Sequence, residues 1–284
     1  MKNYTKSIIA LIFMLVNAVL YAQDFQGVAT YKTSMKMDFK IDSAAQSQGI
    51  NKDMQAKLNE MLQKQFQKEY KLTFTPYESL YKQEEKLAAP SPQNGGFQVM
   101  VVGDGQSSTL YKNTKEKRYA QQQEILGKKF LVQDVLEDTE WKLEKDTKFI
   151  GQYTCYKATR TIEMERMTSM SFGSDSEEEP EVTKEKVTVT AWYTPEIPVN
   201  AGPELYWGLP GLILEVNDGS QTMVCSKIVL NPKKKVSIKE PTNGKKVNAK
   251  KFEEIMRKKT KEMTERYRGN GRGDGNEIRI EIGG

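Results

Sequence analysis

The chain has 284 residues, a formal net charge of +5 and 29% charged residues, and it contains no histidine. Its charge content excludes a polytopic membrane protein, and its length allows one large domain or two small ones with a sizeable core. Without histidine the chain has no Ser-His-Asp or Cys-His nucleophilic site and no imidazole-based zinc, copper or iron site. We therefore expect no metal site and no cofactor, although catalysis by carboxylates, Lys or Tyr stays open.

Residues 1–22 are predicted to form a secretory signal peptide. Lys2 and Lys6 precede an apolar run from Ile8 to Leu20, and the small residue Ala22 stands at the expected cleavage point. The run is too short for a stable membrane anchor, and no cysteine lies near the cleavage point to carry a lipid. We expect an exported mature chain that does not span the membrane, which argues against a nucleic-acid partner.

Residues 23–268 are expected to form a single β-rich domain. A first strand is predicted over Phe25–Ile41, and Met54, Leu58, Met61, Leu62 and Phe66 recur at helical spacing within Asn51–Lys68. Further strands are predicted at Tyr70–Thr75, Glu78–Lys86, Phe97–Val102, Ser108–Tyr111, Lys117–Gln123, Lys129–Val135, Trp141–Glu144, Phe149–Ile162, Lys186–Tyr193, Leu212–Val216 and Gln221–Leu230. Short strands at this spacing, separated by glycine turns, indicate an antiparallel meander.

Three segments differ in composition from the meander. Residues 163–186 are acidic and are predicted to form a solvated hairpin tip, with a calcium site as the alternative. Residues 231–268 are basic and include a predicted helix, Ala249–Tyr267, capped by Asn248. The basic face is interpreted either as solvated or as a surface for an anionic lipid or an acidic partner. Residues 269–284 form a glycine-rich tail in which Glu277–Ile282 alternates like a short edge strand.

Together these elements predict an α+β fold that is mainly antiparallel β. The expected architecture is a curved meander sheet, or open half-barrel, covered by the N-proximal and C-terminal helices. It is similar by analogy to periplasmic lipoprotein carriers, and fold analogy says little about function.

The stretch around Trp207–Val216 is the centre of the sequence. Leu209-Pro210-Gly211-Leu212 has the composition of a type II turn, and it leads into an apolar strand. Before it, Thr194–Gly208 is a long irregular segment with three prolines. Such loops are usually functional or disordered, whereas the alternative is a structural corner that sets the register of the strand.

The same stretch carries a resemblance to a known family. Ala191–Pro203 contains Trp-Tyr, Ile-Pro and Gly-Pro elements in order, and Gly208–Ile213 spells the hexapeptide GLPGLI. Gly151–Ala158, and Leu72–Phe74 with Ser79 and Tyr81, resemble its earlier strands. The chain therefore resembles the GLPGLI family of exported envelope proteins from Bacteroidetes-type bacteria. The resemblance implies location in the periplasm or cell envelope of a Gram-negative bacterium, or secretion, and it supplies no catalytic residues.

We expect a non-enzymatic envelope protein that binds a protein partner or an apolar, lipid-like ligand. The predicted recognition rim is aromatic and lies around the turn, because aromatic side chains concentrate binding energy. Its residues are Trp192, Tyr193, Tyr206, Trp207, Gly208, Leu209, Pro210 and Gly211. The alternative is a carboxylate-dependent periplasmic hydrolase using Glu196, Glu204 or Glu215, which requires two facing carboxylates.

Two cysteines, Cys155 and Cys225, lie in strand-like surroundings. In an oxidising compartment an even count permits one disulfide, which would stabilise the fold by about 4 kcal/mol. The alternative is a pair of buried thiols that do not meet.

Overall fold

The computed structural model of the chain describes residues 25–35, 67–84, 108–167, 170–172, 182–270 and 278–280, of which residues 165–172, 182–183, 263–270 and 278–280 are described by their backbone alone. The predicted signal peptide, most of the helix expected over Asn51–Lys68, the strand expected at Phe97–Val102, most of the acidic tip and most of the glycine-rich tail lie outside these residues. The strands are β1 (Gly27–Met35), β2 (Glu69–Phe74), β3 (Glu78–Gln83), β4 (Thr109–Asn113), β5 (Arg118–Ile125), β6 (Lys128–Val135), β7 (Lys142–Ile150), β8 (Tyr153–Met167), β9 (Met170–Phe172), β10 (Val182–Thr194), β11 (Leu212–Asn217), β12 (Gln221–Leu230), β13 (Lys245–Val247) and β14 (Ile278–Ile280), and the helix α4 spans Ala249–Asn270.

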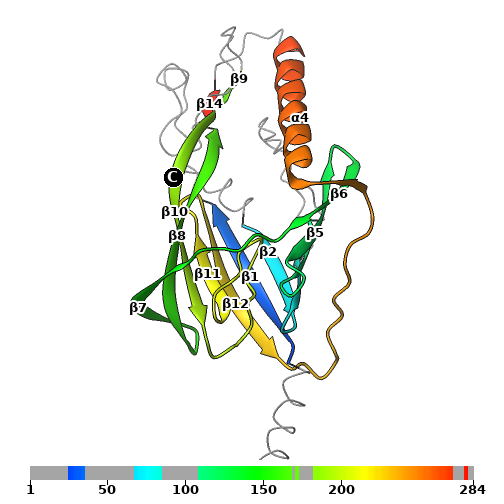
Figure 1. Cartoon of the computed structure of the whole chain (residues 1–284). Coiled ribbons are helices and arrows are strands. Elements are labelled where there is room, and N and C mark those ends of the chain that lie inside the picture. The colour runs from blue at the N-terminus through cyan, green and yellow to red at the C-terminus, as the bar shows by residue number, and fades with distance from the viewer. Residues whose placement is uncertain are drawn as a thin grey trace, which may run out of the picture.

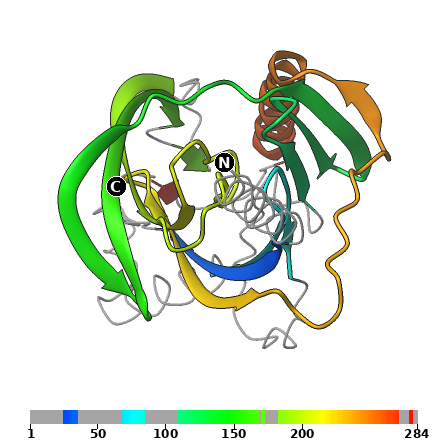
Figure 2. The same cartoon turned by 60° about the horizontal axis from the view of Figure 1, so that its bottom comes forward.

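Twelve of these strands form one open, curved sheet in the order β13-β6-β5-β4-β3-β2-β1-β12-β11-β10-β8-β7 (Figures 1 and 2). All neighbours are antiparallel except β13, which runs parallel to β6. The prediction of a mainly antiparallel, open sheet with a C-terminal helix is confirmed. The sheet is not one continuous meander, because β1 lies in its middle and pairs with β2 on one side and β12 on the other.

The strand boundaries follow the hydrophobic alternation closely in most of the sheet. Gln221–Leu230 is strand β12 as predicted, and the chain turns from β11 into it at Asn217, Asp218 and Gly219. The prediction was wrong at β7, which runs unbroken through Lys142–Ile150. Gly151, with φ of +60°, makes the turn into β8. The charged stretch Glu144–Asp146 bulges against β8, and this local irregularity masked the strand pattern.

The concave side of the sheet is filled by the segment between β10 and β11, which we call the inner loop (residues 195–211). Figure 2 shows this loop inside the curve of the sheet. Its buried residues Ile197, Val199 and Trp207 join one core cluster with Tyr31 of β1 and Phe74 of β2. The expectation that helices cover the concave face is therefore corrected for the C-terminal helix, because the inner loop occupies that place.

Helix α4 begins at the edge of the core and extends beyond the sheet (Figure 1). Asn248 caps it as predicted, since the Asn248 Oδ1 accepts a hydrogen bond from the Lys251 N–H at 2.9 Å. The carboxylate of Asp134 accepts a second bond from the Ala249 N–H at 2.9 Å. The ring of Phe252 packs edge-on against Phe130 with centroids 5.7 Å apart. The first turns of α4 are thus fixed to β6.

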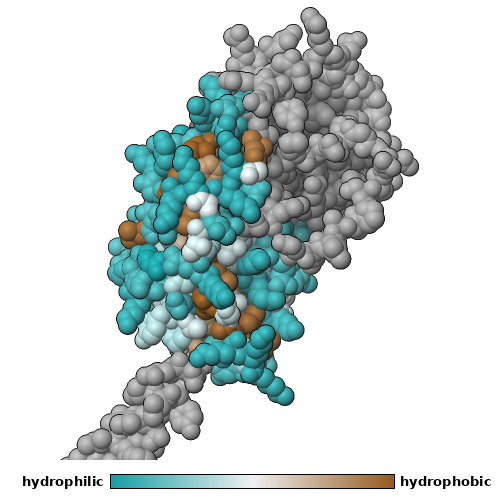
Figure 3. Space-filling view, turned by 90° about the vertical axis from the view of Figure 1, so that its right-hand side faces the viewer, coloured by the Kyte–Doolittle hydropathy of each residue, from teal (hydrophilic) through white to brown (hydrophobic). Residues whose placement is uncertain are grey.

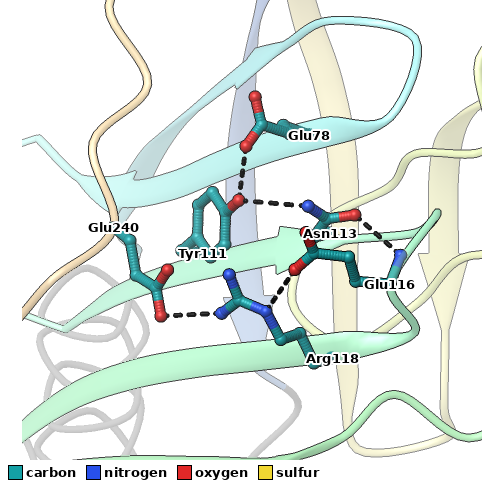
Figure 4. A network of polar contacts seen from close by, with 6 residues as sticks. All are labelled: Glu78, Tyr111, Asn113, Glu116, Arg118 and Glu240. Atoms are coloured by element: carbon teal, nitrogen blue, oxygen red, sulfur yellow. Dashed lines mark hydrogen bonds and ion pairs between the residues drawn. The ribbon is translucent and has the colours of Figure 1, made fainter.

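The segment between β12 and β13, residues 231–244, runs as a strap along the outside of the sheet (Figure 1). Ile238 packs against the cluster formed by Tyr111, Ala120 and Leu131. Glu240 accepts a hydrogen bond from Arg118 at 2.8 Å, and Arg118 also pairs with Glu116 at 2.5 Å. Figure 4 shows how the hydroxyl of Tyr111 continues this network, donating to Glu78 and accepting from Asn113. The strap is therefore held by both apolar and ionic contacts.

A second, two-stranded sheet pairs β14 with β9 in antiparallel register. The alternation in Glu277–Ile282 predicted a short edge strand, and β14 is that strand. Its partner, Met170–Phe172, belongs to the segment between β8 and β10. The tail of the chain therefore returns to the long β8–β10 hairpin.

Candidate functional site

The inner loop is shaped by its prolines and by hydrogen bonds to the strand that follows it. Around Pro198 the Val199 N–H donates to the Ile197 carbonyl at 2.8 Å, and around Pro210 the Gly211 N–H donates to the Leu209 carbonyl at 2.8 Å. Both are the i to i+2 bonds of γ-turns. The predicted type II turn at residues 209–212 is therefore wrong, and a tighter turn replaces it.

Gly211 is required by the close approach of two backbone segments. A Cβ at this position would lie 2.1 Å from the carbonyl oxygen of Thr194, a contact that no side chain tolerates. Thr194 and Leu212 are paired residues of β10 and β11, so the glycine stands where the loop closes on itself. The glycine thus allows β10 and β11 to pair directly at the base of the 17-residue inner loop, residues 195–211.

A buried lysine holds the middle of the inner loop. Lys112 of β4 has no solvent exposure. Its Nζ donates hydrogen bonds to the backbone carbonyls of Gly202 at 2.8 Å, Glu204 at 2.5 Å and Tyr206 at 3.2 Å. An ammonium group has three donors and all three are used. Burial lowers the pKa of Lys112 to about 7, and the nearby Glu204 carboxylate opposes this shift.

Glu204 is a charged neighbour of Lys112, and its own neighbours include Asp218 and Tyr81. Burial raises the pKa of Glu204, and the neighbouring carboxylate of Asp218 raises it further. The pKa of Tyr81 is also raised, first by burial and then by Glu204. The hydroxyl of Tyr81 is buried and has no hydrogen-bond partner among the described residues. Glu204 itself has φ of +44°, an uncommon conformation for a residue other than glycine.

The segment that connects β6 to β7 holds Trp207 by hydrogen bonds to both its indole ring and its backbone carbonyl. Its indole Nε1 donates to the Glu137 carbonyl at 3.1 Å. Its own carbonyl accepts bonds from the Thr139 hydroxyl at 2.9 Å and the Trp141 indole at 2.8 Å. In Figure 2 this connection crosses over the open side of the curved sheet. The connection therefore ties the two ends of the sheet to the inner loop.

The other predicted aromatic residues divide between two environments. Tyr193 and Tyr206 belong to a buried cluster with Leu209 and Ile213. Arg160 lies over the ring of Tyr206, 5.2 Å from its centroid. Trp192 is partly buried on the sheet instead, where Lys148 lies 4.4 Å from its ring centroid. Lys148 also binds both oxygens of the Glu215 carboxylate at 2.7 Å.

The structure does not bring the predicted residues together as an exposed aromatic rim. Tyr193, Tyr206 and Trp207 are at most 7% exposed and Leu209 is 1% exposed. Gly211 is buried as well, whereas Gly208 and Pro210 are exposed. The expectation of a rim is corrected to a buried aromatic anchor under an exposed turn. The aromatic rings pack against apolar surface inside the curved sheet. The free energy gained by burying them there favours this position over an exposed one in a loop.

The expected disulfide is absent. Cys155 and Cys225 are buried free thiols. They lie on β8 and β12, which are separated in the sheet by β10 and β11. Both side chains belong to the same core cluster, but no bond joins them. Burial raises the pKa of Cys155 to about 11 and that of Cys225 to about 12.

The three carboxylates of the hydrolase alternative do not converge. Glu196 is exposed and accepts a hydrogen bond from the Thr154 N–H at 2.9 Å. Glu215 is committed to Lys148. Burial and then the Asp218 carboxylate raise the pKa of Glu204, whereas the charge of Lys112 opposes this shift. The Asp218 carboxylate already accepts bonds from the backbone of Ser220 and Gln221.

Lys112 was missed from sequence, although a signal for it existed. Leu110 and Lys112 are two residues apart in β4 and therefore lie on the same face of the strand, and Leu110 is buried. A lysine two residues from a buried leucine in the same strand is placed on the buried face. Buried lysines need several acceptors, and the carbonyl-rich inner loop supplies them. The partners could not be read from the sequence, because they are 90 to 94 residues away.

Within the described ranges, no helix is long and apolar enough to cross a bilayer. In the same part of the chain, no group of three or more Cys, Asp or Glu side chains is arranged to hold a metal ion.

Comparison with known proteins gives a family match and weak structural similarities. Residues 141–215, about a quarter of the chain, match the model of the Porph_ging family, described as a protein of unknown function. The match includes β7, β8, β9, β10, the inner loop and the first part of β11. No curated protein matches the chain.

Among solved structures, PNGF-II in space group C2 has 15% sequence identity and a TM-score of 0.45 over 82% of this chain and 33% of PNGF-II. PNGF-II in space group P21 has 17% identity and a TM-score of 0.45 over 82% and 34%. LprF from Mycobacterium bovis has 9% identity and a TM-score of 0.25 over 79% of this chain and 92% of LprF. The chain therefore spans about a third of PNGF-II.

Proposed function

We propose that the chain is a non-enzymatic, exported accessory protein of the cell envelope that binds a protein partner through the outward side of its inner loop. The observation that carries the proposal is the rigid fixation of this loop. Lys112 holds three of its carbonyls, and the connection between β6 and β7 binds Trp207 at both its indole and its carbonyl. A loop fixed in one conformation loses little entropy when it binds, which favours recognition.

The outward side of the loop has the composition of a contact surface. Leu205 is 40% exposed, and Pro195, Pro198, Gly208 and Pro210 are exposed beside it in the loop sequence. Prolines present apolar surface without a backbone donor, and they cost little entropy when ordered. A protein partner is favoured over an apolar, lipid-like ligand because the concave side of the sheet, where a lipid chain would lie, holds the inner loop itself.

Site-specific photocrosslinking tests the proposal. A benzoyl-phenylalanine residue at position 205 of the full chain, in cells, is expected to give one protein adduct of defined mass. The matched control is position 229, because Val229 is 38% exposed on the sheet, close to the 40% exposure of Leu205. The adduct at 205 should disappear in a Pro210→Asp background. An adduct of lipid mass, equal adducts at both positions, or none at 205 would refute the protein-binding function.

A carboxylate-dependent hydrolase is the second candidate, favoured by the raised pKa of Glu204 beside Asp218. A carboxyl group with a raised pKa is better suited to act as a general acid than an ordinary carboxyl group. Screening the purified chain against Glu204→Gln on peptide, ester and glycoside substrates decides this point. Turnover that vanishes in Glu204→Gln would replace the binding function, and equal background rates in both would exclude the hydrolase.

A further inference from the structure

An exposed basic corner lies where β13 joins the sheet. The turn from β5 to β6 contains Leu126 and Gly127, with φ of +48° and +77°, followed by Lys128 and Lys129. Parallel pairing places Lys245 of β13 opposite Phe130 and Lys246 opposite Leu131. Residues 128–131 and 245–246 are thus adjacent along the sheet edge. The corner gathers four lysines from two segments that are more than 100 residues apart.

The lysines of this corner form no ion pairs with the side chains that the structure describes. Lys128, Lys129, Lys245 and Lys246 are exposed, and none of the four has an ion-pair partner among the described side chains. The nearby acids are used elsewhere: Asp134 caps α4, and Glu240 binds Arg118. The other charged residue paired across the turn is Glu124, opposite Lys129. Figure 3 shows this side of the molecule, which is mostly hydrophilic with small, scattered hydrophobic areas.

One apolar side chain protrudes beside these lysines. Leu126 is 60% exposed at the tip of the turn, in a backbone conformation that favours Asn or Gly. A leucine gains nothing for the fold at this position. An apolar side chain next to several lysines is instead the composition of surfaces that lie on anionic lipid, with the lysines at the headgroups and the apolar group between them.

We propose that this corner, formed by Leu126, Lys128, Lys129, Lys245 and Lys246, docks the protein on an anionic lipid surface. The site is separate from the inner loop and does not depend on the proposed function. Charge complementarity selects the lipid, since lysines near an anionic bilayer bind without needing a shaped pocket. A single protruding leucine inserts into a fluid interface, whereas a partner protein would need a matching cavity. Further exposed lysines of the strap, Lys233, Lys234 and Lys239, add to the positive field.

Vesicle co-sedimentation of the full chain tests this docking. Vesicles of phosphatidylglycerol and phosphatidylcholine are compared with vesicles of phosphatidylcholine alone, at low and high salt. Exchange of the four lysines of the corner for Gln should weaken binding to the anionic vesicles on the order of 600-fold, at about fivefold for each lysine. Every variant carries the same apolar run at residues 8–20, and each is measured on both kinds of vesicle. This run therefore does not contribute to the difference in binding between variants.

Matched controls keep the result specific. Exchange of Lys32, Lys82, Lys145 and Lys227 for Gln removes the same charge from exposed positions elsewhere and should change binding little. Leu126→Asn should weaken binding several-fold, whereas Val135→Asn, at a position with 62% exposure, should not. Equal loss in both lysine variants, equal binding to both vesicle types, or insensitivity to salt would overturn the proposal. Circular dichroism confirms that each variant is folded.

Discussion

The Nε1 of Trp141 donates a hydrogen bond to the backbone carbonyl of Trp207 at 2.8 Å, linking the connection before β7 to the middle of the inner loop. Trp207 in turn donates from its own indole to the Glu137 carbonyl at 3.1 Å. The two tryptophans therefore form a reciprocal clasp between the loop and residues 137–141. The position that sequence analysis assigned to an exposed rim is thus structural in the free protein.

Trp207→Ala is expected to destabilise the fold by about 3–5 kcal/mol, because it removes a buried indole and its hydrogen bond. Trp207 is 6% exposed, so the substitution removes a side chain from the core and not from an exposed rim. Urea denaturation measures the free energy of unfolding. Trp192→Ala is the control, because Trp192 is only partly buried, and its loss should cost about 1 kcal/mol. Equal costs for the two would contradict the clasp.

Lys112→Met is expected to destabilise the protein by about 3 kcal/mol, because three buried carbonyls of the inner loop lose their donor. The loop should also become accessible to limited proteolysis near residues 202–206 while the sheet stays protected. Lys82→Met, an exposed lysine of β3, is the control and should change little. Unaltered protease resistance in Lys112→Met would show that the ammonium does not hold the loop.

The pH dependence of stability should report the same lysine. Its pKa is about 7 in the fold and 10.5 ordinarily, so between these values the unfolded chain binds a proton that the folded chain does not. Stability due to Lys112 therefore rises as pH increases from about 7 to 10.5, and it is lost as pH falls towards 7. The free-energy difference between wild type and Lys112→Met, measured at several pH values, should grow over this window. A constant difference would place the pKa of Lys112 near its ordinary value.

Gly211→Ala is expected to destabilise the fold by more than 2 kcal/mol, since the added Cβ meets the Thr194 carbonyl at 2.1 Å and both are backbone-fixed. The control is Gly127→Ala, where nothing lies within 4 Å and only the left-handed φ of +77° is strained. That substitution should cost about 1 kcal/mol. Thermal denaturation of both variants gives the comparison, and a Gly211→Ala protein as stable as Gly127→Ala would show that the two segments can separate cheaply.

The thiols should be unreactive in the folded chain. Burial raises the pKa values of Cys155 and Cys225 to about 11 and about 12, so little thiolate is present at pH 8. Labelling with iodoacetamide without reductant is expected to modify neither cysteine in native protein and both after denaturation. Because the folded pKa values are raised, stability is full below the ordinary pKa of 9 and falls as pH rises through 11–12. Failure to label denatured, unreduced protein would reveal a disulfide after all.

The sequence allowed most strands to be predicted, because alternation is a local property. Gln221–Leu230 was found residue for residue, and the Asn248 cap was identified from a single side chain. The inner loop was recognised as unusual from its three prolines. What it does could not be predicted, since the same aromatic residues suit an exposed rim or a buried anchor. The choice between these depends on the curvature of a sheet whose strands lie far apart in sequence.

Long-range pairing accounts for the other errors. Nothing near Gly27 indicates that it will pair with Leu230, and nothing near Lys245 indicates parallel pairing with Phe130. The carbonyls that accept hydrogen bonds from Lys112 could not be predicted for the same reason, because each lies at least 90 residues away in the sequence. Type II and γ-turns share proline and glycine preferences. Composition at residues 209–212 therefore indicated a turn without fixing its type.

The central position of β1 has a consequence for the order in which the fold is made. β1 is the first described strand, yet one of its two neighbours, β12, ends at Leu230. During synthesis the strands β1 to β6 can pair among themselves, but one edge of β1 stays unpaired until residues 221–230 emerge. The chain must therefore keep one strand edge open until most of its residues have been made, and an open strand edge is prone to aggregation.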